Sequence, residues 1–447
     1  MKLVINNGLL VDPKNKIFTK LNIAVENGKV KEISKEKLKG DCEIDAEGLC
    51  VTPGFVDIHM HEDPIVDDKV KINIFDRMLK MGVTTVIGGN CGIGTNNPKR
   101  YFELLDEGNP VNCGLLLPHA ILREYIGAND RYESLEHEDI EKMYQYGKKL
   151  MKENGFFGVS FGIRYIPGMD FNELITIAKL GEEKVVAAHI RDDAENVYGA
   201  VEEFLEVGDY VKTHLQVSHI GSMAGFGQID KFFQIVDEKR AKGADVASDC
   251  YPYSAFSTKI GETTFDEGFI ERYNTGYESL EVMEGEFKGQ RCTEEMFFKL
   301  RKEHPETMMV GHLMNSDDIE KALANPNTVV ASDGILGING DGHPRAAGSF
   351  PRFIAKYVRD KKLMSLYEGI EKITYAPAKL YGINKGGLSI GDDGDITIFS
   401  LEELEDKATF AENGLAPEGI KYVIINGEIA VKDGEIINGK LGKSLKR

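Results

Sequence analysis

Two histidines end an apolar run near the N-terminus, in the stretch VTPGFVDIHMHEDP that covers residues 51–64. His59 and His61 lie one residue apart, and Glu62 and Asp63 follow them directly. If the apolar run is a β-strand, side chains two residues apart point to the same side, so both imidazoles can face one site. Imidazole is the commonest metal ligand among side chains, so the pair indicates a metal site. We expect Glu62 and Asp63 to be neighbouring polar residues rather than ligands.

Four more candidate ligands end or follow apolar runs further along the chain. Cys91 follows TTVIGG, His189 ends VVAAH, His219 follows LQVS and Asp333 follows VVAS. Each residue alone has a structural interpretation: a hydrogen-bonded histidine, a small buried cysteine or an aspartate that starts a turn. Together, however, thiol, imidazole and carboxylate groups suit a borderline-soft cation such as Zn²⁺, and burying them unpaired would be costly.

These candidates come together only if the apolar runs are parallel strands. Eight such runs occur, and most are separated by helical stretches such as residues 137–154, 171–183 and 228–243. Alternating strands and helices predict a parallel sheet, and eight units predict a (β/α)8 TIM barrel, whose functional residues gather at the carboxyl ends of the strands. The charged segment of residues 256–304 breaks the alternation, and we expect it to be an insertion near the barrel mouth.

The two ends of the chain have a different pattern. Short apolar runs separated by Asn-Gly and Asp-Gly turns occur at both ends, which is typical of hairpins. We therefore expect residues 1–52 and 385–447 to form one small β-sandwich domain, and residues 53–384 to form the barrel.

Charge and apolar content narrow the range of partners. The chain of 447 residues has a formal net charge of −19, which argues against nucleic acid or an anionic membrane as a partner. We find no apolar run of transmembrane length and no signal peptide, so we expect a cytoplasmic protein. The six cysteines lack CxxC spacing, and we expect them to be reduced. The oligomeric state does not follow from the sequence.

The motifs resemble those of a known superfamily. PGFVDIHMH at the end of a first barrel strand, with His, His and Asp at later strand ends, is similar to the amidohydrolase superfamily. Within it, the ordered motifs GGNCGIG, FGVSFGIRYIPG, HIRDDAEN, VSHI, DCYPYSAFST, SDG and HPRAAGSFPR resemble the N-acyl-D-amino-acid deacylases, or D-aminoacylases. The stretches GGLSIGDDGDITIF and VIINGEIAVKDGE resemble the superfamily's C-terminal β-sandwich strands.

The resemblance implies a metal centre that includes a cysteine. Many dinuclear amidohydrolases bridge their metals with a carboxylated lysine at the end of the fourth strand, but the stretch GFFGVSFGIRYIP contains no Lys. Cys91 is the available thiolate, and metal coordination would deprotonate it. The resemblance implies one tight Zn²⁺ site, and a second site that is weaker or partly occupied. The tight site would contain Cys91, His189 and His219, and the second His59, His61 and Asp333.

The implied activity is the hydrolysis of N-acyl-D-amino acids to a carboxylic acid and a free D-amino acid. Zinc lowers the pKa of bound water to about 7 and so supplies hydroxide, and Asp333 is the predicted general base. Arg345, in HPR, is predicted to bind the carboxylate of this small anionic substrate, because its planar guanidinium can hold two oxygens. Tyr253 is predicted to donate a hydrogen bond to the carboxylate or the oxyanion. Asp249, Tyr251 and Tyr253 share one strand face, so the choice of tyrosine stays open.

One departure from the family pattern leaves the substrate open. The family usually has Lys two residues after the sixth-strand histidine, where this chain has Gly221. Either another cation, such as Lys259, replaces that lysine, or the substrate differs. The alternatives are an amidohydrolase of cyclic amides or other acylated amines, like dihydroorotase or hydantoinase, and a non-catalytic metal-binding relative. The missing fourth-strand lysine argues against the first, and the full set of ligands argues against the second.

Overall fold

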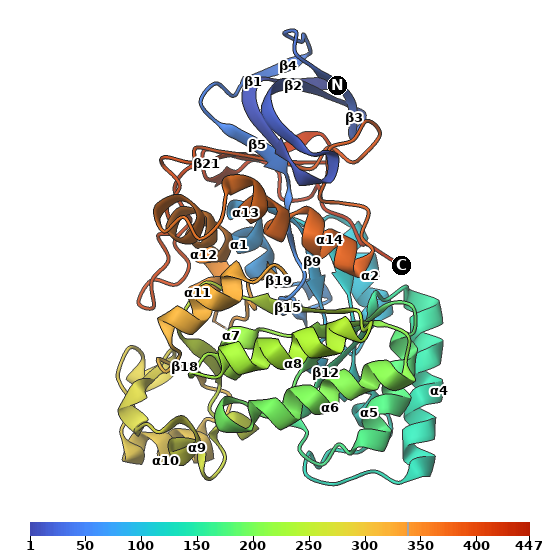
Figure 1. Ribbon diagram of the computed structural model, residues 1–447, viewed down its shortest axis with the longest axis vertical. Coiled ribbons are helices and arrows are strands. Elements are labelled where there is room, and N and C mark those ends of the chain that lie inside the picture. The colour runs from blue at the N-terminus through green and yellow to red at the C-terminus, as the bar shows by residue number, and fades with distance from the viewer. Residues whose placement is uncertain (338) are drawn as a thin grey trace.

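Eight parallel strands form a barrel in the computed structural model, which describes residues 1–337 and 339–447 (Figure 1). In chain order they are β6 (Phe55–Asp57), β9 (Val83–Gly88), β10 (Asn112–Leu115), β12 (Gly158–Gly162), β13 (Val185–His189), β14 (His214–Val217), β15 (Val246–Cys250) and β19 (Thr328–Val330). The short β11 (Leu117–Pro118) extends the third strand and pairs with β12. A parallel bridge between Met60 and Gly334 joins the first strand to the eighth. The predicted (β/α)8 barrel is confirmed.

The barrel strands are buried along their whole length. Every residue of β9 and of β13 is buried. Parallel strands covered by helices on one face and by barrel side chains on the other lose the apolar–polar alternation of half-exposed strands. This explains why the runs that predict these strands are almost continuously apolar.

Amphipathic helices cover the outside of the barrel. In α4 (His137–Asn154), Ile140, Met143 and Leu150 are buried at helical spacing, and the helix ends at Gly155, whose φ of 70° suits a left-handed C-cap. The other barrel helices are α1 (Ile74–Lys80), α2 (Pro98–Asp106), α3 (His119–Tyr125), α5 (Phe171–Ala178), α6 (Val197–Tyr210), α7 (Ile220–Ala224), α8 (Ile229–Ala241), α11 (Ser316–Ala324), α12 (Arg345–Arg352), α13 (Leu366–Ile373) and α14 (Tyr375–Tyr381). Among the described residues, no helix has both the length and the apolar character that crossing a membrane requires.

Strands from both ends of the chain share one sheet, at the top of Figure 1. The strands are β1 (Lys2–Asp12), β2 (Ile17–Glu26), β3 (Lys29–Ser34), β4 (Cys42–Asp45), β5 (Cys50–Pro53), β20 (Ile396–Phe399), β21 (Ile420–Ile425), β22 (Glu428–Lys432) and β23 (Glu435–Ile436). The two halves meet where β5 pairs antiparallel with β20. A separate apolar core contains side chains from both halves, including Ile5, Val51 and Ile398. The expectation that both termini build one β-rich domain is confirmed.

The segment after β15 forms a small antiparallel sheet of its own, yellow in Figure 1. It contains β16 (Phe256–Lys259), β17 (Leu280–Val282) and β18 (Met308–Gly311), together with α9 (Phe269–Tyr273) and α10 (Glu294–Glu303). The rings of Phe265, Phe269 and Phe297 pack together within it. This segment coincides with the interruption in the strand–helix alternation of the sequence.

Candidate metal centre and substrate pocket

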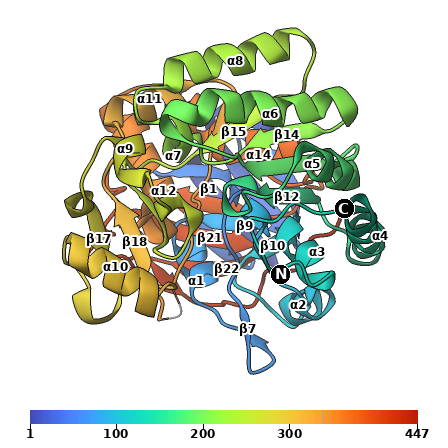
Figure 2. The same cartoon turned by 90° about the horizontal axis from the view of Figure 1, so that it is seen from below.

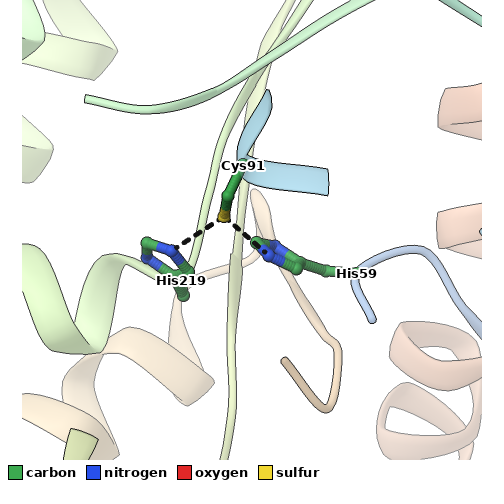
Figure 3. A group of neighbouring side chains, drawn as sticks. All are labelled: His59, Cys91 and His219. Atoms are coloured by element: carbon green, nitrogen blue, oxygen red, sulfur yellow. Dashed lines mark hydrogen bonds between the residues drawn. The ribbon is translucent and has the colours of Figure 1, made fainter. Parts of the chain in front are cut away.

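Cys91 lies among buried histidines at the carboxyl ends of the barrel strands (Figure 3). Its Sγ is 3.3 Å from Nε2 of His59 and 3.4 Å from Nε2 of His219. The ligand atoms of these three residues all lie within 4.8 Å of one another, close enough to hold one metal ion. His189 lies beside this group: it lines the same pocket as Cys91, and its ring centroid is 4.5 Å from that of His219.

A second group of potential ligands shares His59 with the first. Oδ1 of Asp333 is 3.4 Å from Nε2 of His59 and 3.3 Å from Nε2 of His61. The ligand atoms of this group also lie within 4.8 Å of one another. The structure therefore brings all six sequence-predicted ligands to one place. Distance alone groups His59, rather than His189, with Cys91 and His219.

Three of these residues have a left-handed backbone, which is uncommon outside glycine. The angle φ is 53° at Cys91, 34° at His219 and 48° at Asp333. Each such residue costs on the order of 1–3 kcal/mol and persists only where its surroundings hold it, and such residues concentrate at functional sites. Backbone strain thus coincides with the cluster.

The turn that carries Cys91 packs tightly against the fourth strand. Oγ of Ser160, on β12, accepts a hydrogen bond from Gly92 N at 3.0 Å and donates one to Gly89 O. A Cβ atom on Gly92 would lie 2.6 Å from the backbone nitrogen of Gly162, so only glycine fits there. The fourth strand, which lacks lysine, supports the cysteine turn through Ser160.

Glu62 and Asp63 bind backbone groups next to the cluster. The carboxylate of Glu62 accepts hydrogen bonds from Gly89 N at 2.6 Å and from Thr95 N at 3.0 Å. The carboxylate of Asp63 accepts three hydrogen bonds from the backbone at the start of α1. Both residues therefore hold the loops that surround the ligands.

Asp249 connects two of the histidines, a contact that the sequence analysis did not predict. Its Oδ1 accepts hydrogen bonds from Nδ1 of His59 at 3.0 Å and from the backbone nitrogen of His219 at 2.8 Å. Its Oδ2 accepts one from Nε2 of Gln216 at 2.8 Å. Because Nδ1 of His59 faces a carboxylate, it carries a proton, and Nε2 faces Cys91 and Asp333. An aspartate inside an apolar strand was the sequence signal for this role.

The cluster perturbs the pKa values of its members. Burial alone would raise the pKa of the Cys91 thiol, but the neighbouring His59 and His219 hold it well below its usual value. Burial also opposes ionisation of Asp333, but Arg345 and His219 hold its pKa well below the ordinary range. The surroundings therefore favour a thiolate and a carboxylate, the forms that bind cations.

The cluster opens into a pocket. The ligand candidates His61, Cys91, His189, His219 and Asp333 line one part of it. The segment after β15 contributes much of the remaining wall, including Phe256, Lys259 and Tyr273. A small molecule in this pocket would contact both the cluster and the inserted segment.

Arg345 lines this pocket, whereas Tyr253 is not among the residues that line it. Nη1 of Arg345 is 2.9 Å from Oδ2 of Asp333, and its Nη2 donates to Ser257 O at 3.3 Å. Its Nε has no hydrogen-bond partner among the described residues, although the side chain is only 2% exposed. The hydroxyl of Tyr253 donates to Oδ2 of Asp406 at 2.8 Å. Arg345 thus contributes a buried cation to the lining of the pocket.

Gly221, at the position of the family lysine, and Lys259, the cation that could replace it, have different surroundings. A Cβ atom on Gly221 would meet the side chain of Ile319 at 2.7 Å and that of Cys250 at 3.1 Å, so this position faces the core. Lys259 lines the pocket, but its side chain is 39% exposed and pairs with Glu306. The buried cation in the pocket wall is Arg345.

Comparison with known proteins agrees with this geometry. A family model described as the Amidohydrolase family matches residues 83–431. The chain belongs to the amidohydrolase family. This amidohydrolase is 26% identical to a D-aminoacylase of Alcaligenes xylosoxydans xylosoxydans, over 100% of this chain and 97% of the relative. It is 27% identical to an N-acyl-D-glutamate deacylase of the same organism, over 96% and 93%. The resemblance to D-aminoacylases predicted from the motifs is confirmed.

Solved structures of related enzymes also match this chain over its full length. The N-acyl-D-glutamate deacylase from Bordetella bronchiseptica, in complex with zinc and a phosphonate mimic of the tetrahedral intermediate, matches this amidohydrolase with a TM-score of 0.88. That comparison covers 100% of this chain and 99% of the other, at 26% identity. A D-hydantoinase matches with a TM-score of 0.63 at 17% identity, which shows the shared fold alone.

Proposed function

We propose that the protein is a zinc-dependent hydrolase that deacylates N-acyl-D-amino acids to a carboxylic acid and a free D-amino acid. The observation that carries this proposal is the buried cluster around Cys91, with Asp333 and Arg345 paired at its edge. The cluster provides donors for a metal, and Arg345 provides a cation for the substrate's carboxylate. Two relatives, named as a D-aminoacylase and an N-acyl-D-glutamate deacylase, match this chain over almost their full length and support the same reaction.

The donor set fits Zn²⁺. Thiolate and imidazole are the ligands that zinc prefers in proteins, and the donor atoms of His59, Cys91 and His219 lie within 4.8 Å of one another. Zinc bound here would polarise the acyl carbonyl and lower the pKa of water to about 7, which supplies the nucleophile. We assign the tight site to Cys91, His189 and His219, and a weaker one to His59, His61 and Asp333.

Asp333 and Arg345 divide the remaining tasks. Asp333 lies between the histidines and Arg345, and we assign to it the uptake of a proton from the attacking water and its delivery to the leaving amine. Arg345 binds the α-carboxylate through its guanidinium group. The proposal gives no role to Tyr253, because its hydroxyl donates to Asp406.

Hydrolysis of a cyclic amide is the alternative within the same family. A dihydroorotase of Aquifex aeolicus (strain VF5) is 25% identical over 98% of this chain. The cysteine at the centre of the cluster and the absence of lysine from the fourth strand favour the deacylase over this alternative.

A parallel assay of substrates separates the two activities. Zinc-loaded protein is incubated with N-acetyl-D-amino acids, their L-enantiomers, dihydroorotate and hydantoins, and the release of free amine or the opening of the ring is measured. We expect release of D-amino acids, loss of activity after chelation and recovery when zinc is added. Ring opening without release of D-amino acids would show that the proposal is wrong.

A further inference from the structure

A groove adjoins the catalytic pocket on the side of the β7–β8 hairpin. This hairpin, β7 (Ile65–Val66) and β8 (Lys69–Val70), projects from the body of the protein (Figure 2). His61, Ile93, Lys259 and Ile335 line both the pocket and the groove. The groove and the pocket therefore lie next to each other and share part of their lining.

The groove presents hydrocarbon to the solvent. Ile65, Val66, Ile93, Ile335 and Leu336 line it, and all five are at least partly exposed. Val66 is 47% exposed and Ile93 is 45% exposed. Accessible apolar side chains gathered at one place, next to a catalytic pocket, indicate a binding surface.

Two carboxylates in the wall of the groove, those of Glu62 and Asp63, accept hydrogen bonds from the protein's own backbone. The two carboxylate oxygens of Glu62 accept hydrogen bonds from Gly89 N and Thr95 N. One carboxylate oxygen of Asp63 accepts from the start of α1. The remaining charged side chains, such as Glu124 and Lys71, are exposed or half-buried. Because these two carboxylates are occupied by the backbone, the apolar side chains of the groove remain for contact with an uncharged chain.

The position of Arg345 decides which part of a substrate reaches the groove. Arg345 lines the pocket but not the groove, whereas His61, from the cluster, lines both. The α-carboxylate and the side chain of an N-acyl amino acid are both attached to Cα, and the acyl chain lies beyond the scissile amide bond. With the carboxylate on Arg345 and the amide carbonyl at the cluster, the acyl chain points away from Arg345, past His61.

We infer that this groove binds the acyl chain, and that the preferred substrates are N-acyl-D-amino acids whose acyl group is an aliphatic chain longer than acetyl. The inference rests on the proposed deacylase function and adds the class of acyl group. A second copy of this chain seated on the same apolar surface is the competing explanation, and the experiment distinguishes the two.

The test measures kcat/KM for N-acetyl, N-butyryl and N-octanoyl derivatives of one D-amino acid. Full burial of one methylene group should raise kcat/KM about fourfold, and burial in a half-open groove should raise it about twofold. Octanoyl has six more carbons than acetyl, so we expect a gain of about 60-fold in kcat/KM. Equal values for acetyl and octanoyl would overturn the inference and leave the deacylase proposal intact. Hydrolysis of none of the three would overturn the deacylase proposal itself.

A surface variant ties the effect to the groove. Val66→Ser should reduce the advantage of octanoyl over acetyl by about threefold and leave the hydrolysis of acetyl unchanged, because Val66 lies in the groove and not at the cluster. Ile437→Ser is the matched control, since Ile437 is 61% exposed and lies after β23. The inference is wrong if both variants change octanoyl hydrolysis equally. It is also wrong if Val66→Ser dissociates a dimer while the chain-length series stays flat.

Discussion

Replacing Asp249 by Asn should weaken metal binding without removing any ligand. Three donors converge on the carboxylate: His59 Nδ1, His219 N and Gln216 Nε2, at 3.0, 2.8 and 2.8 Å. Asparagine has a single acceptor oxygen. If that oxygen takes the place of Oδ1 and keeps the two histidine contacts, the new NH₂ group faces the NH₂ group of Gln216.

The amide of Gln216 also contacts His214. Its Oε1 is 3.2 Å from Nε2 of His214, and the amide atom that suits this contact depends on which ring nitrogen carries the proton. Whichever way the amide turns, the substitution loses a charge-assisted hydrogen bond to His59. The consequence is a His59 ring that is held less firmly in both orientation and tautomer.

The expected loss follows from these contacts. A hydrogen bond to a charged group contributes about 1.5–3 kcal/mol, and removal of a carboxylate that orients a ligating histidine costs about 10–100-fold in metal affinity. The two estimates agree, because each tenfold change corresponds to about 1.4 kcal/mol. We expect the dissociation constant for zinc to rise about 10–100-fold in Asp249→Asn.

Competition with a chromophoric chelator measures that constant, and thermal unfolding of the metal-free protein measures the structural contribution. Asp245→Asn is the matched control, because Asp245 also contacts a histidine, His214, at 3.0 Å, but its side chain is 70% exposed. We expect less than a twofold change in zinc affinity for the control. If Asp249→Asn binds zinc as tightly as the parent and differs only in melting temperature, the carboxylate does not orient the ligands.

Three further predictions address the ligands, the substrate and the fold. Cys91→Ala should lose most of its zinc by elemental analysis, whereas Cys292→Ala should keep it; equal zinc contents would contradict the assignment. Arg345→Lys should lower kcat/KM for N-acyl-D-amino acids about 10–100-fold and change little for substrates with an amidated carboxylate; an equal loss for both would make its role structural. Glu173→Gln, which breaks a buried ion pair with Arg123, should lower the free energy of unfolding by about 3–5 kcal/mol in urea titrations. Burial would raise the pKa of Glu173, but Arg123 lowers it from 4.5 to about 2. The contribution of this ion pair to the free energy of unfolding should therefore be full above pH 4.5 and fade towards pH 2. A difference in stability between the parent and Glu173→Gln that does not change with pH would refute this.

The elements could be predicted because their signals are local. The run VVAAH coincides with β13, and the stretch from His137 to Asn154 coincides with α4, whose end is marked by Gly155. The convergence of the six candidate ligands followed from the fold alone, since the carboxyl ends of parallel barrel strands meet at one rim. No distance was needed for that step.

The partners of individual side chains depend on contacts between distant segments, which no local pattern specifies. Tyr253 bonds to Asp406, which lies 153 residues later in the chain. Position 221 faces Ile319 rather than the pocket. The sharing of His59 between two groups of ligands likewise depends on distances of 3–4 Å between different strands.

The strained backbone of the site shows why its supporting residues matter as much as its ligands. A residue in the left-handed conformation relaxes unless its neighbours prevent it. Each of the three strained residues lies at or beside a backbone N–H bound by a buried side chain. Ser160 binds Gly92, next to Cys91. Asp249 binds the nitrogen of His219 itself. Asp57 binds the nitrogens of His59 and of Ser332, the residue before Asp333.

None of these three supports belongs to the candidate ligands, and all three lie on barrel strands. A rigid sheet therefore holds the strained turns, and the turns hold the ligands. Loss of a support should relax the turn and disperse the donors even where all six ligands remain. For this reason, retention of the ligand residues in a related sequence does not by itself establish a working centre. The serine and the two aspartates must be present, or be replaced by groups that bind the same backbone nitrogens.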